Sequence, residues 1–381
     1  MTEPSGPESR LAGLQMVNPH LAEGSGSLGR TYVDVPGSGE PLPSDPGPLG
    51  VAIDGAGRRH DLAGWLAATY ATSLVVVRGG TVVHEWYADG LGPGDLFLGA
   101  SMTKSALAHL VGDAVAAGDL SLDDPVVDLV PELAGSGWAT CTVADVASMT
   151  SGVDWVEDHR DPDGPASRLV GAFAGSGGSS RALLTRVGPA EPPGTRFEYC
   201  TADSQVLDWV RERATGRTYV EATAAMWRTL GCEHGAVVGT DDEGVAMAGG
   251  ALAATARDWA RVGLHQLAGG EWVELSSRPA YPWLRPGRLP SSISALLGFG
   301  MHWWPLDDAG RQVTADGSRG QFCFVDRDRE VVVVKTSQWP YADPWADRQY
   351  RDLSILGLAA IADADTGTTT SSTTIDREEP S

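Results

Sequence analysis

The stretch Phe97-Leu-Gly-Ala-Ser101-Met-Thr-Lys104-Ser-Ala-Leu-Ala-His-Leu-Val111 begins a segment whose apolar residues recur every three or four positions as far as Gly118. This spacing predicts a helix with Ser101 at its amino terminus. Lys104 stands three residues later on the same face, so its amine can reach the Ser101 hydroxyl. Unpaired backbone N–H groups at such a terminus suit a developing oxyanion. The pattern therefore indicates a serine nucleophile with a lysine as its proton acceptor.

Lysine is rare in this sequence, which makes its position informative. Of the 28 basic residues only Lys104 and Lys335 are lysine, and all the others are arginine. Arginine cannot release its proton in a protein, whereas a desolvated lysine can become a neutral base. The simpler alternative is that Ser101 caps the helix and Lys104 is a surface residue.

Two later segments carry groups that fit the same chemistry. Tyr199 stands at a turn before a predicted helix, where its phenol could shuttle a proton if a neighbouring ammonium lowers its pKa. A packed aromatic ring is the alternative. Residues 316–321, Asp-Gly-Ser-Arg-Gly-Gln, precede a predicted hairpin, and their glycines let a strand edge approach a ligand. The N–H of Ser318 could complete an oxyanion hole, although a simple turn explains these glycines equally well.

Hydrophobic periodicity predicts strands near both ends of the chain and helices between them. Residues 73–87, with Gly79-Gly80 at the turn, and residues 321–335 each predict a hairpin. Helical patterns cover residues 101–117, 143–149, 202–215, 219–230 and 256–267. We therefore expect an α+β fold in which an antiparallel sheet assembled from distant segments is flanked by helices, beside an all-α region.

The same patterns suggest domain boundaries. Residues 1–50 are rich in Gly, Pro and Ser and predict an irregular arm. Residues 51–99 and 251–362 predict one discontinuous α/β domain, and residues 100–250 predict a mainly α-helical domain. Residues 363–381 are Thr-, Ser- and acid-rich, which predicts a disordered tail.

Composition limits the class of partner. A net charge of −22 opposes binding to nucleic acid or to an anionic membrane. No run of about eighteen apolar residues and no leader pattern is visible, so the cytoplasm is the expected location. The four cysteines and eight histidines show no metal-ligand spacing, which disfavours a metal-dependent hydrolase. A small-molecule substrate is the expected partner.

In their order, Ser101-x-x-Lys104, Tyr199 before a helix and a glycine-rich strand before a hairpin resemble the penicillin-recognising serine hydrolases. Over roughly residues 60–360 the chain is most similar to the 6-aminohexanoate-dimer (nylon-oligomer) hydrolases of that β-lactamase-like family. The segments that carry this likeness are Leu129–Gly135, Phe197–Ala202, Ala248–Gly250, Thr255–Arg261, Arg319–Gln321 and Val334–Pro340.

The resemblance implies a β-lactamase-like fold and an amidase or carboxylesterase that needs no cofactor and is commonly a homodimer. It implies Ser101 as nucleophile, Lys104 as base and Tyr199 as proton relay, with the N–H groups of Ser101 and Ser318 as the oxyanion hole. It places substrate contacts at His159, Arg319, Gly320 and Gln321.

Three positions depart from the relatives. Lys335-Thr-Ser337 resembles the Lys-Thr-Gly triad of β-lactamases but follows the hairpin instead of preceding it, and Thr201 stands where an asparagine is usual. His159 replaces a loop tyrosine that contacts the scissile amide nitrogen, although it could equally be a surface residue of an acidic loop. The first two departures disfavour β-lactamase activity, and the third favours esters over amides. A β-lactamase, a D-amino-acid peptidase and a slowly acylating sensor protein are the alternatives.

Overall fold

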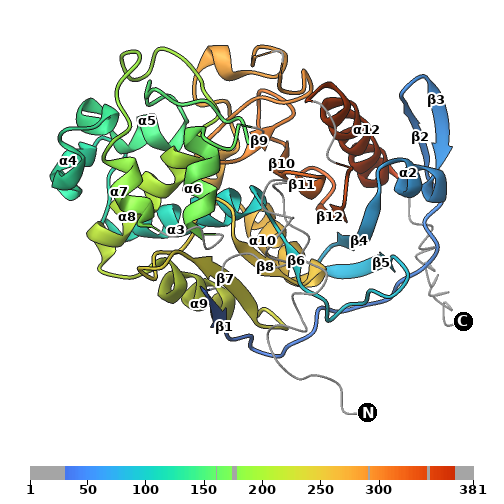
Figure 1. The fold of residues 1–381 in the computed structure, drawn as a ribbon. Coiled ribbons are helices and arrows are strands. Elements are labelled where there is room, and N and C mark those ends of the chain that lie inside the picture. Colours follow the sequence, from blue (N-terminus) through green and yellow to red (C-terminus); the bar gives the residue numbers. More distant parts are fainter. Residues whose placement is uncertain (1–30, 160, 174–177, 291, 341–343, 365–381) are drawn as a thin grey trace, which may run out of the picture.

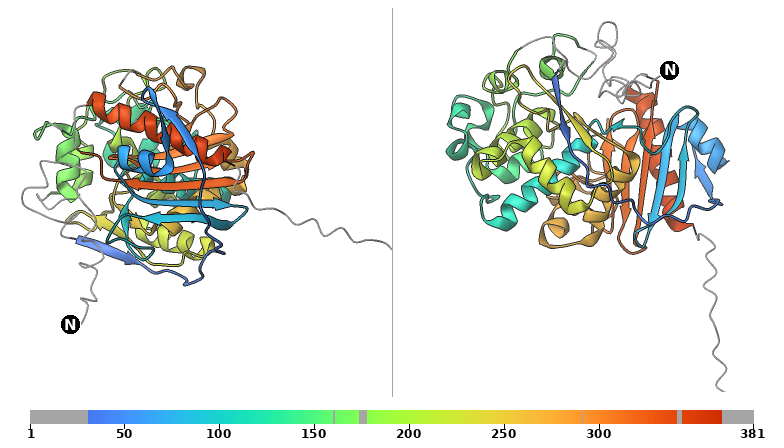
Figure 2. Two further views of the ribbon diagram at one scale, coloured as in Figure 1. Left: turned by 90° about the vertical axis from the view of Figure 1, so that its right-hand side faces the viewer. Right: turned by 90° about the horizontal axis from the view of Figure 1, so that it is seen from below.

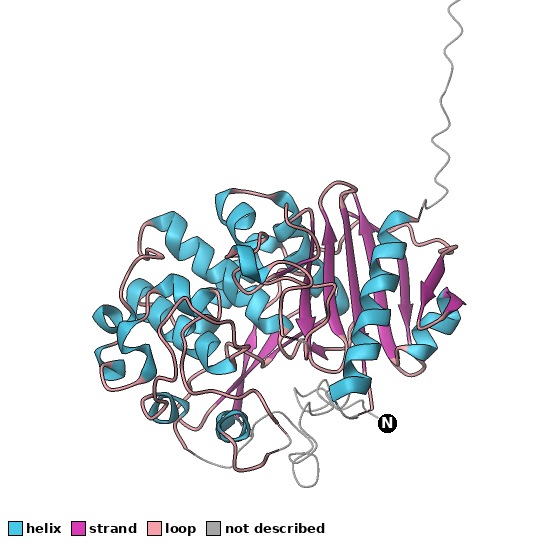
Figure 3. Ribbon diagram, turned by 90° about the horizontal axis from the view of Figure 1, so that it is seen from above, coloured by secondary structure: helices cyan, strands magenta, loops and turns pink. Residues whose placement is uncertain are grey.

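The largest sheet among the described residues has six antiparallel strands (Figures 1 and 3). The computed structural model describes residues 31–159, 161–173, 178–290, 292–340 and 344–364. The strands lie in the order β5-β4-β12-β11-β10-β9. Their bounds are β4 Ala71–Arg78, β5 Thr81–Tyr87, β9 Trp304–Pro305, β10 Gln312–Gly317, β11 Gln321–Asp326 and β12 Val331–Ser337. The sheet thus joins segments from the two ends of the chain, and the predicted α+β architecture is confirmed.

Both faces of this sheet are buried. In β12, Val332 and Val334 belong to the core shared with α10 (Ala256–Ala268), whereas Val331 and Val333 belong to the core under α12 (Pro344–Asp363). Successive side chains of a strand point to opposite faces, so an unbroken valine run suits a strand covered on both sides. Figure 3 shows α12 lying across one face of the strands.

The two hairpins form where the sequence predicts them. β4 pairs with β5 through Gly79 and Gly80, whose φ angles of 50° and 80° are left-handed and favour glycine. β11 pairs with β12 across the polar turn at residues 327–330. A smaller hairpin, β2 (Ala52–Gly55) with β3 (Arg58–Asp61), leads into α2 (Leu62–Ala68).

Helices fill the other side of the molecule, where α3 and α8 pack against each other (Figures 1 and 2). The five predicted helices are all present within two residues of the predicted bounds. The helices of this half are α3 Met102–Ala117, α4 Val126–Leu129, α5 Val143–Ala147, α6 Pro165–Phe173, α7 Ser180–Leu184, α8 Thr201–Thr215 and α9 Tyr219–Leu230. α11 (Glu271–Ser276) follows α10. Left-handed glycines at 118, 216 and 231 end α3, α8 and α9.

A second sheet has the strand order β1-β7-β8-β6. Its strands are β1 Thr31–Val35, β6 Phe97–Leu98, β7 Ala236–Thr240 and β8 Leu252–Ala254. β1 lies within the predicted irregular arm, so that prediction is wrong for residues 31–35. Residues 43–47 also run along β5, with hydrogen bonds of 2.8 and 2.9 Å to Val82. β1 pairs with β7, about 200 residues further along the chain. The five residues of β1 alone therefore do not indicate that they form a strand.

Residues 1–30 of the predicted arm and 365–381 of the predicted tail lie outside the described residues. Within the described ranges, no helix has the length and apolar character needed to cross a membrane.

Candidate active site

Ser101 occupies a sharp turn at the start of α3. It is the N-cap residue, but its side chain makes no capping hydrogen bond. Ala100 before it has a φ angle of 46°, a left-handed conformation that alanine rarely adopts. Gly99 allows the chain before this turn to pack closely against Trp259, because a side chain at position 99 would overlap the indole. The Ser101 hydroxyl is therefore presented to its neighbours, and the simple helix-cap alternative is excluded.

Lys104 is buried, with 3% of its surface exposed, and its amine has three acceptors. Nζ lies 3.1 Å from Ser101 Oγ, 3.1 Å from Thr201 Oγ1 and 2.6 Å from the carbonyl oxygen of Gly249. Burial lowers the pKa of Lys104 to about 8, although the charge of Glu157 opposes this change. An amine with this pKa can accept a proton near neutral pH, as a general base must. The surface-lysine alternative is also excluded.

Tyr199 lies beside both groups. Its ring stacks on Trp304 with centroids 5.6 Å apart, and Lys104 Nζ is 5.1 Å from the ring centroid. Burial raises the pKa of Tyr199 well above its usual range, the charge of Glu157 raises it further, and a hydrogen bond with Ser101 opposes the rise. The condition attached to the predicted proton shuttle, a pKa lowered by a neighbouring ammonium, is therefore not met, because burial raises the pKa. The phenol stays protonated, so it can act only as a neutral donor and acceptor.

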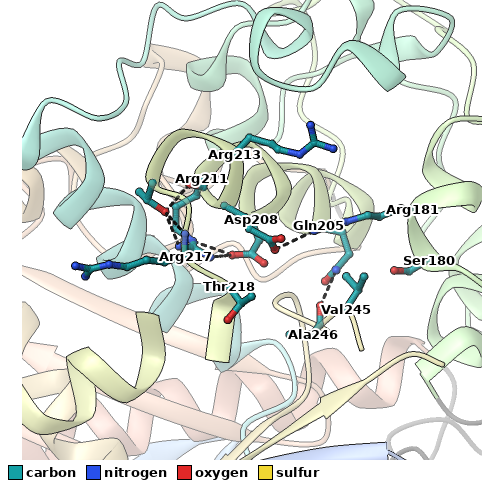
Figure 4. A network of polar contacts seen from close by, with 12 residues as sticks. Ser180, Arg181, Gln205, Asp208, Arg211, Arg213, Arg217, Thr218, Val245 and Ala246 are labelled. Carbon is teal, nitrogen blue, oxygen red and sulfur yellow. Dashed lines mark hydrogen bonds and ion pairs between the residues drawn. The ribbon is translucent and has the colours of Figure 1, made fainter. Parts of the chain in front are cut away.

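Helix α8 fixes the Gly249 carbonyl that Lys104 contacts. Gln205 donates from Nε2 to the Ala246 carbonyl at 2.9 Å and accepts from the Gly249 N–H at 3.2 Å. Figure 4 shows Gln205 reaching Ala246 and, further along α8, the buried pair of Arg211 and Asp208 at 2.8 Å. The Lys104 site thus depends on α3, on α8 and on the loop before β8.

The end of β10 lies directly against the beginning of α3. A side chain at Gly317 would overlap the Gly99 carbonyl and come within 3.2 Å of the Met102 nitrogen. Only glycine permits this approach, which brings the backbone of Ser318 alongside the Ser101 turn. The two backbone segments predicted to form an oxyanion hole are therefore brought together.

The turn after β10 is held by side chains from within the fold. Arg319 and Gly320 have φ angles of 62° and 91°, and a side chain at Gly320 would overlap the Trp339 indole. Gln321 is 7% exposed, and its Nε2 donates to the Ser337 carbonyl at 2.7 Å and to the Arg319 carbonyl at 3.2 Å. Gln321 therefore braces the turn, while its predicted role in substrate binding stays a prediction.

His159 lies near the site but contacts a carboxylate. Its Nε2 is 3.1 Å from Glu157 Oε1, and Glu157 in turn accepts hydrogen bonds from Thr201. Sequence reasoning missed Glu157, Thr201 and Gly249 as neighbours of Lys104. No spacing rule could reveal them, because the loop before α6 and the loop before β8 meet Lys104 only through the tertiary fold.

Lys335 lies on the far face of the sheet, under α12. Its amine contacts the hydroxyls of Ser337 and Ser354 and lies 5.4 Å from the Trp65 ring centroid. Burial lowers the pKa of Lys335 well below its usual value. Its location agrees with the interpretation that Lys335-Thr-Ser337 does not correspond to the β-lactamase triad.

The described residues contain no group of three or more His, Cys, Asp or Glu side chains arranged to hold a metal ion. That the reaction needs no metal or cofactor stays a prediction. The four cysteines are free and buried.

A family model described as Beta-lactamase matches residues 66–357 of this chain. The chain belongs to the beta-lactamase family. It is 32% identical to a 6-aminohexanoate-dimer hydrolase of Paenarthrobacter ureafaciens over 324 residues, which cover 79% of this chain and 81% of the relative. It is a hydrolase of this family, for which a serine nucleophile is the shared mechanism.

Two further comparisons concern a second relative and the fold. Penicillin-binding protein 4 of Amycolatopsis lactamdurans is 27% identical over 175 residues, or 45% of this chain and 43% of that protein. The fold matches a Bacillus anthracis structure provisionally described as a 6-aminohexanoate-dimer hydrolase, with a TM-score of 0.75 and 20% identity. That match covers 95% of this chain and 96% of the other.

Direct titration of the lysines tests the electrostatics of this beta-lactamase-family site. Because the chain has only two lysines, protein labelled with ¹³C-lysine gives two Cε signals, which the Lys104→Arg variant assigns. We expect the Lys104 signal to titrate near pH 8, and the Lys335 signal to titrate well below the usual lysine range. A Lys104 midpoint at the ordinary value of about 10.4 would contradict the site as described.

Proposed function

We propose that this protein hydrolyses small linear amides or esters through an acyl-enzyme intermediate on Ser101. The observation that carries the proposal is the buried Lys104 amine, 3.1 Å from Ser101 Oγ and with its pKa lowered to about 8 by burial. The 6-aminohexanoate-dimer hydrolase relative supports the substrate class.

In acylation, neutral Lys104 takes the proton from Ser101 as Oγ bonds to the substrate carbonyl carbon. The negative charge that develops on the carbonyl oxygen meets the N–H groups of Ser101 and Ser318. Arg319, Gly320 and Gln321 form the adjoining turn, and we propose that this turn borders the bound substrate.

Collapse of the tetrahedral intermediate breaks the bond to the leaving group, which must receive a proton. Tyr199 hydrogen-bonds with Ser101 and lies next to Lys104, so it can pass the proton from Lys104 to the departing nitrogen or oxygen. Water then attacks the acyl carbon with the same groups in reversed roles, releasing the acid and restoring Ser101.

Esters should react faster than amides. An amine leaves only when its nitrogen is protonated as the bond breaks, whereas an alkoxide leaves more easily. The resemblance to nylon-oligomer hydrolases implies that His159 stands at the position of a loop tyrosine, and the Nε2 atom of His159 contacts Glu157. Because this nitrogen already contacts the carboxylate, we propose that His159 is a weaker hydrogen-bond donor to an amide nitrogen than a tyrosine would be.

The protein also fits a reducing compartment such as the cytoplasm, since all four cysteines are free and buried. We also propose a homodimer, solely because the hydrolases that the sequence resembles are commonly homodimers. A sensor function would differ in the second half-reaction, because a sensor retains its acyl group whereas this proposal requires its release.

Ser101→Ala should abolish hydrolysis of p-nitrophenyl acetate while leaving the circular dichroism spectrum unchanged, since the variant loses only the attacking hydroxyl.

Lys104→Arg should be nearly as inactive as Lys104→Ala, because a permanent cation cannot accept the proton. A Lys104→Arg enzyme that kept more than about a tenth of the wild-type rate, a barrier change under about 1.4 kcal/mol, would show that Lys104 is not the base.

His159→Tyr should raise the ratio of amide to ester hydrolysis, because the phenol can reach toward the leaving nitrogen as a donor. The measurement compares kcat/KM for the 6-aminohexanoate dimer and for a short-chain ester in the two enzymes. His234→Tyr, at a histidine 37% exposed and outside the site, is the matched control. An unchanged ratio in the His159 variant, or a wild type that already cleaves the dimer as fast as its esters, would contradict this role.

A further inference from the structure

Glu157 is surrounded by hydrogen-bond donors. Oε1 faces the Thr201 hydroxyl and His159 Nε2 at 3.1 Å, and Oε2 accepts from the Thr201 N–H at 2.9 Å and from Trp155 Nε1 at 2.6 Å. Two donors at each oxygen suit an ionised carboxylate, whereas an amide could accept at one end only. Burial alone would raise the pKa of Glu157, but the hydrogen bond and charge of His159 and the charge of Lys104 outweigh it and hold the pKa at about 2.

The carboxylate determines the direction of the Thr201 hydroxyl. A hydroxyl has one proton, and Thr201 donates it to Glu157. Toward Lys104, 3.1 Å away, Thr201 can therefore only accept. The Gly249 carbonyl, 2.6 Å from the same amine, is also an acceptor.

These two acceptors determine how a neutral Lys104 is oriented. A neutral amine has two N–H groups and one lone pair, and here the N–H groups are drawn to Thr201 and Gly249. The lone pair is then left for the third neighbour, Ser101 Oγ, at 3.1 Å. If Thr201 were free to donate, its proton could occupy the lone pair, and Lys104 would be a poorer base toward Ser101.

We propose that Glu157 is a positioning residue for hydrolysis, which makes Thr201 an obligate acceptor and thereby aims the lone pair of Lys104 at Ser101. This inference rests on the proposed function, in which Lys104 is the base. The proposal assigns a role to the loop of residues 152–159. In the sequence analysis, His159 was the one residue of this loop predicted to contact substrate.

The charged and titratable groups around this network come from four segments, one of which is the segment before β9, where the charge of Lys104 contributes to the lowered pKa of buried His302. Lys104 faces Glu157 from α3, and His159 faces it from the same loop. Tyr199 and Cys200 face it from the residues before α8, and the Glu157 charge raises the pKa of both beyond the rise that burial causes. In Lys104 the same charge opposes the lowering by burial, so its removal should lower the pKa of this base further.

The test combines Glu157→Gln with two substitutions at Thr201. In Glu157→Gln, the acid limb of kcat/KM for p-nitrophenyl acetate should move to lower pH, and the plateau should fall about tenfold or more. Thr201→Val should lower kcat by about tenfold or more with KM nearly unchanged, because shape is kept and the acceptor is lost. Thr201→Ser should restore activity to within about threefold of the wild type, since it keeps the hydroxyl.

Controls separate this role from a general structural one and from failure of the proposed function. Glu132→Gln removes an equally negative side chain that is 44% exposed and pairs with Arg213, and it should leave the pH profile unchanged. The ¹³C-lysine titration reports the Lys104 pKa without any turnover, and it should fall in Glu157→Gln. An unmoved Lys104 titration, or a Thr201→Ser enzyme as slow as Thr201→Val, would overturn the proposal. A wild type without turnover would contradict the proposed function and with it the positioning role, whereas an active wild type with an unmoved Lys104 titration in Glu157→Gln would contradict the positioning role alone.

Discussion

The burial of a single amine, that of Lys104, is the constraint on which the site depends. Taking an ammonium out of water is unfavourable, and this cost lowers the pKa to about 8. The burial requires α3, α8 and the loop before β8 to meet at one point, since Ser101, Thr201 and Gly249 come from those three segments. The proposed base is therefore a property of the assembled fold, although the proposed nucleophile, Ser101, lies only three residues from Lys104 in the sequence.

Comparison with Lys335 separates the effect of burial on a lysine pKa from the neighbouring groups that a reaction at Lys104 would need. Both lysines are buried and both have lowered pKa values. Lys335 has hydroxyls and aromatic rings around it under α12, but it lies on the opposite side of the sheet from the turn that presents Ser101. Burial alone thus lowers the pKa of an amine, whereas the strained turn at Ala100 and the glycine at 317 bring the proposed reaction partners next to Lys104 only.

Much of this architecture could be predicted from local pattern. The valine-rich strands, the Gly79-Gly80 turn and the helical spacing after Ser101 are signals carried by neighbouring residues, and the corresponding elements form. β1 was missed because its pairing with β7 lies about 200 residues away. Glu157 was missed because only tertiary contacts surround it with donors. The lowered pKa considered for Tyr199 is not found, because burial, which a sequence does not display, raises the pKa of this phenol.

Peptide mass spectrometry after brief reaction with a fluorophosphonate or a slowly released acyl ester tests most directly whether Ser101 is the nucleophile. A nucleophilic Ser101 predicts one adduct per chain, on the peptide that carries this residue, and no adduct when the enzyme is unfolded before the reaction. Stoichiometric labelling of another residue, with Ser101 unmodified in an enzyme that turns over substrate, would contradict it.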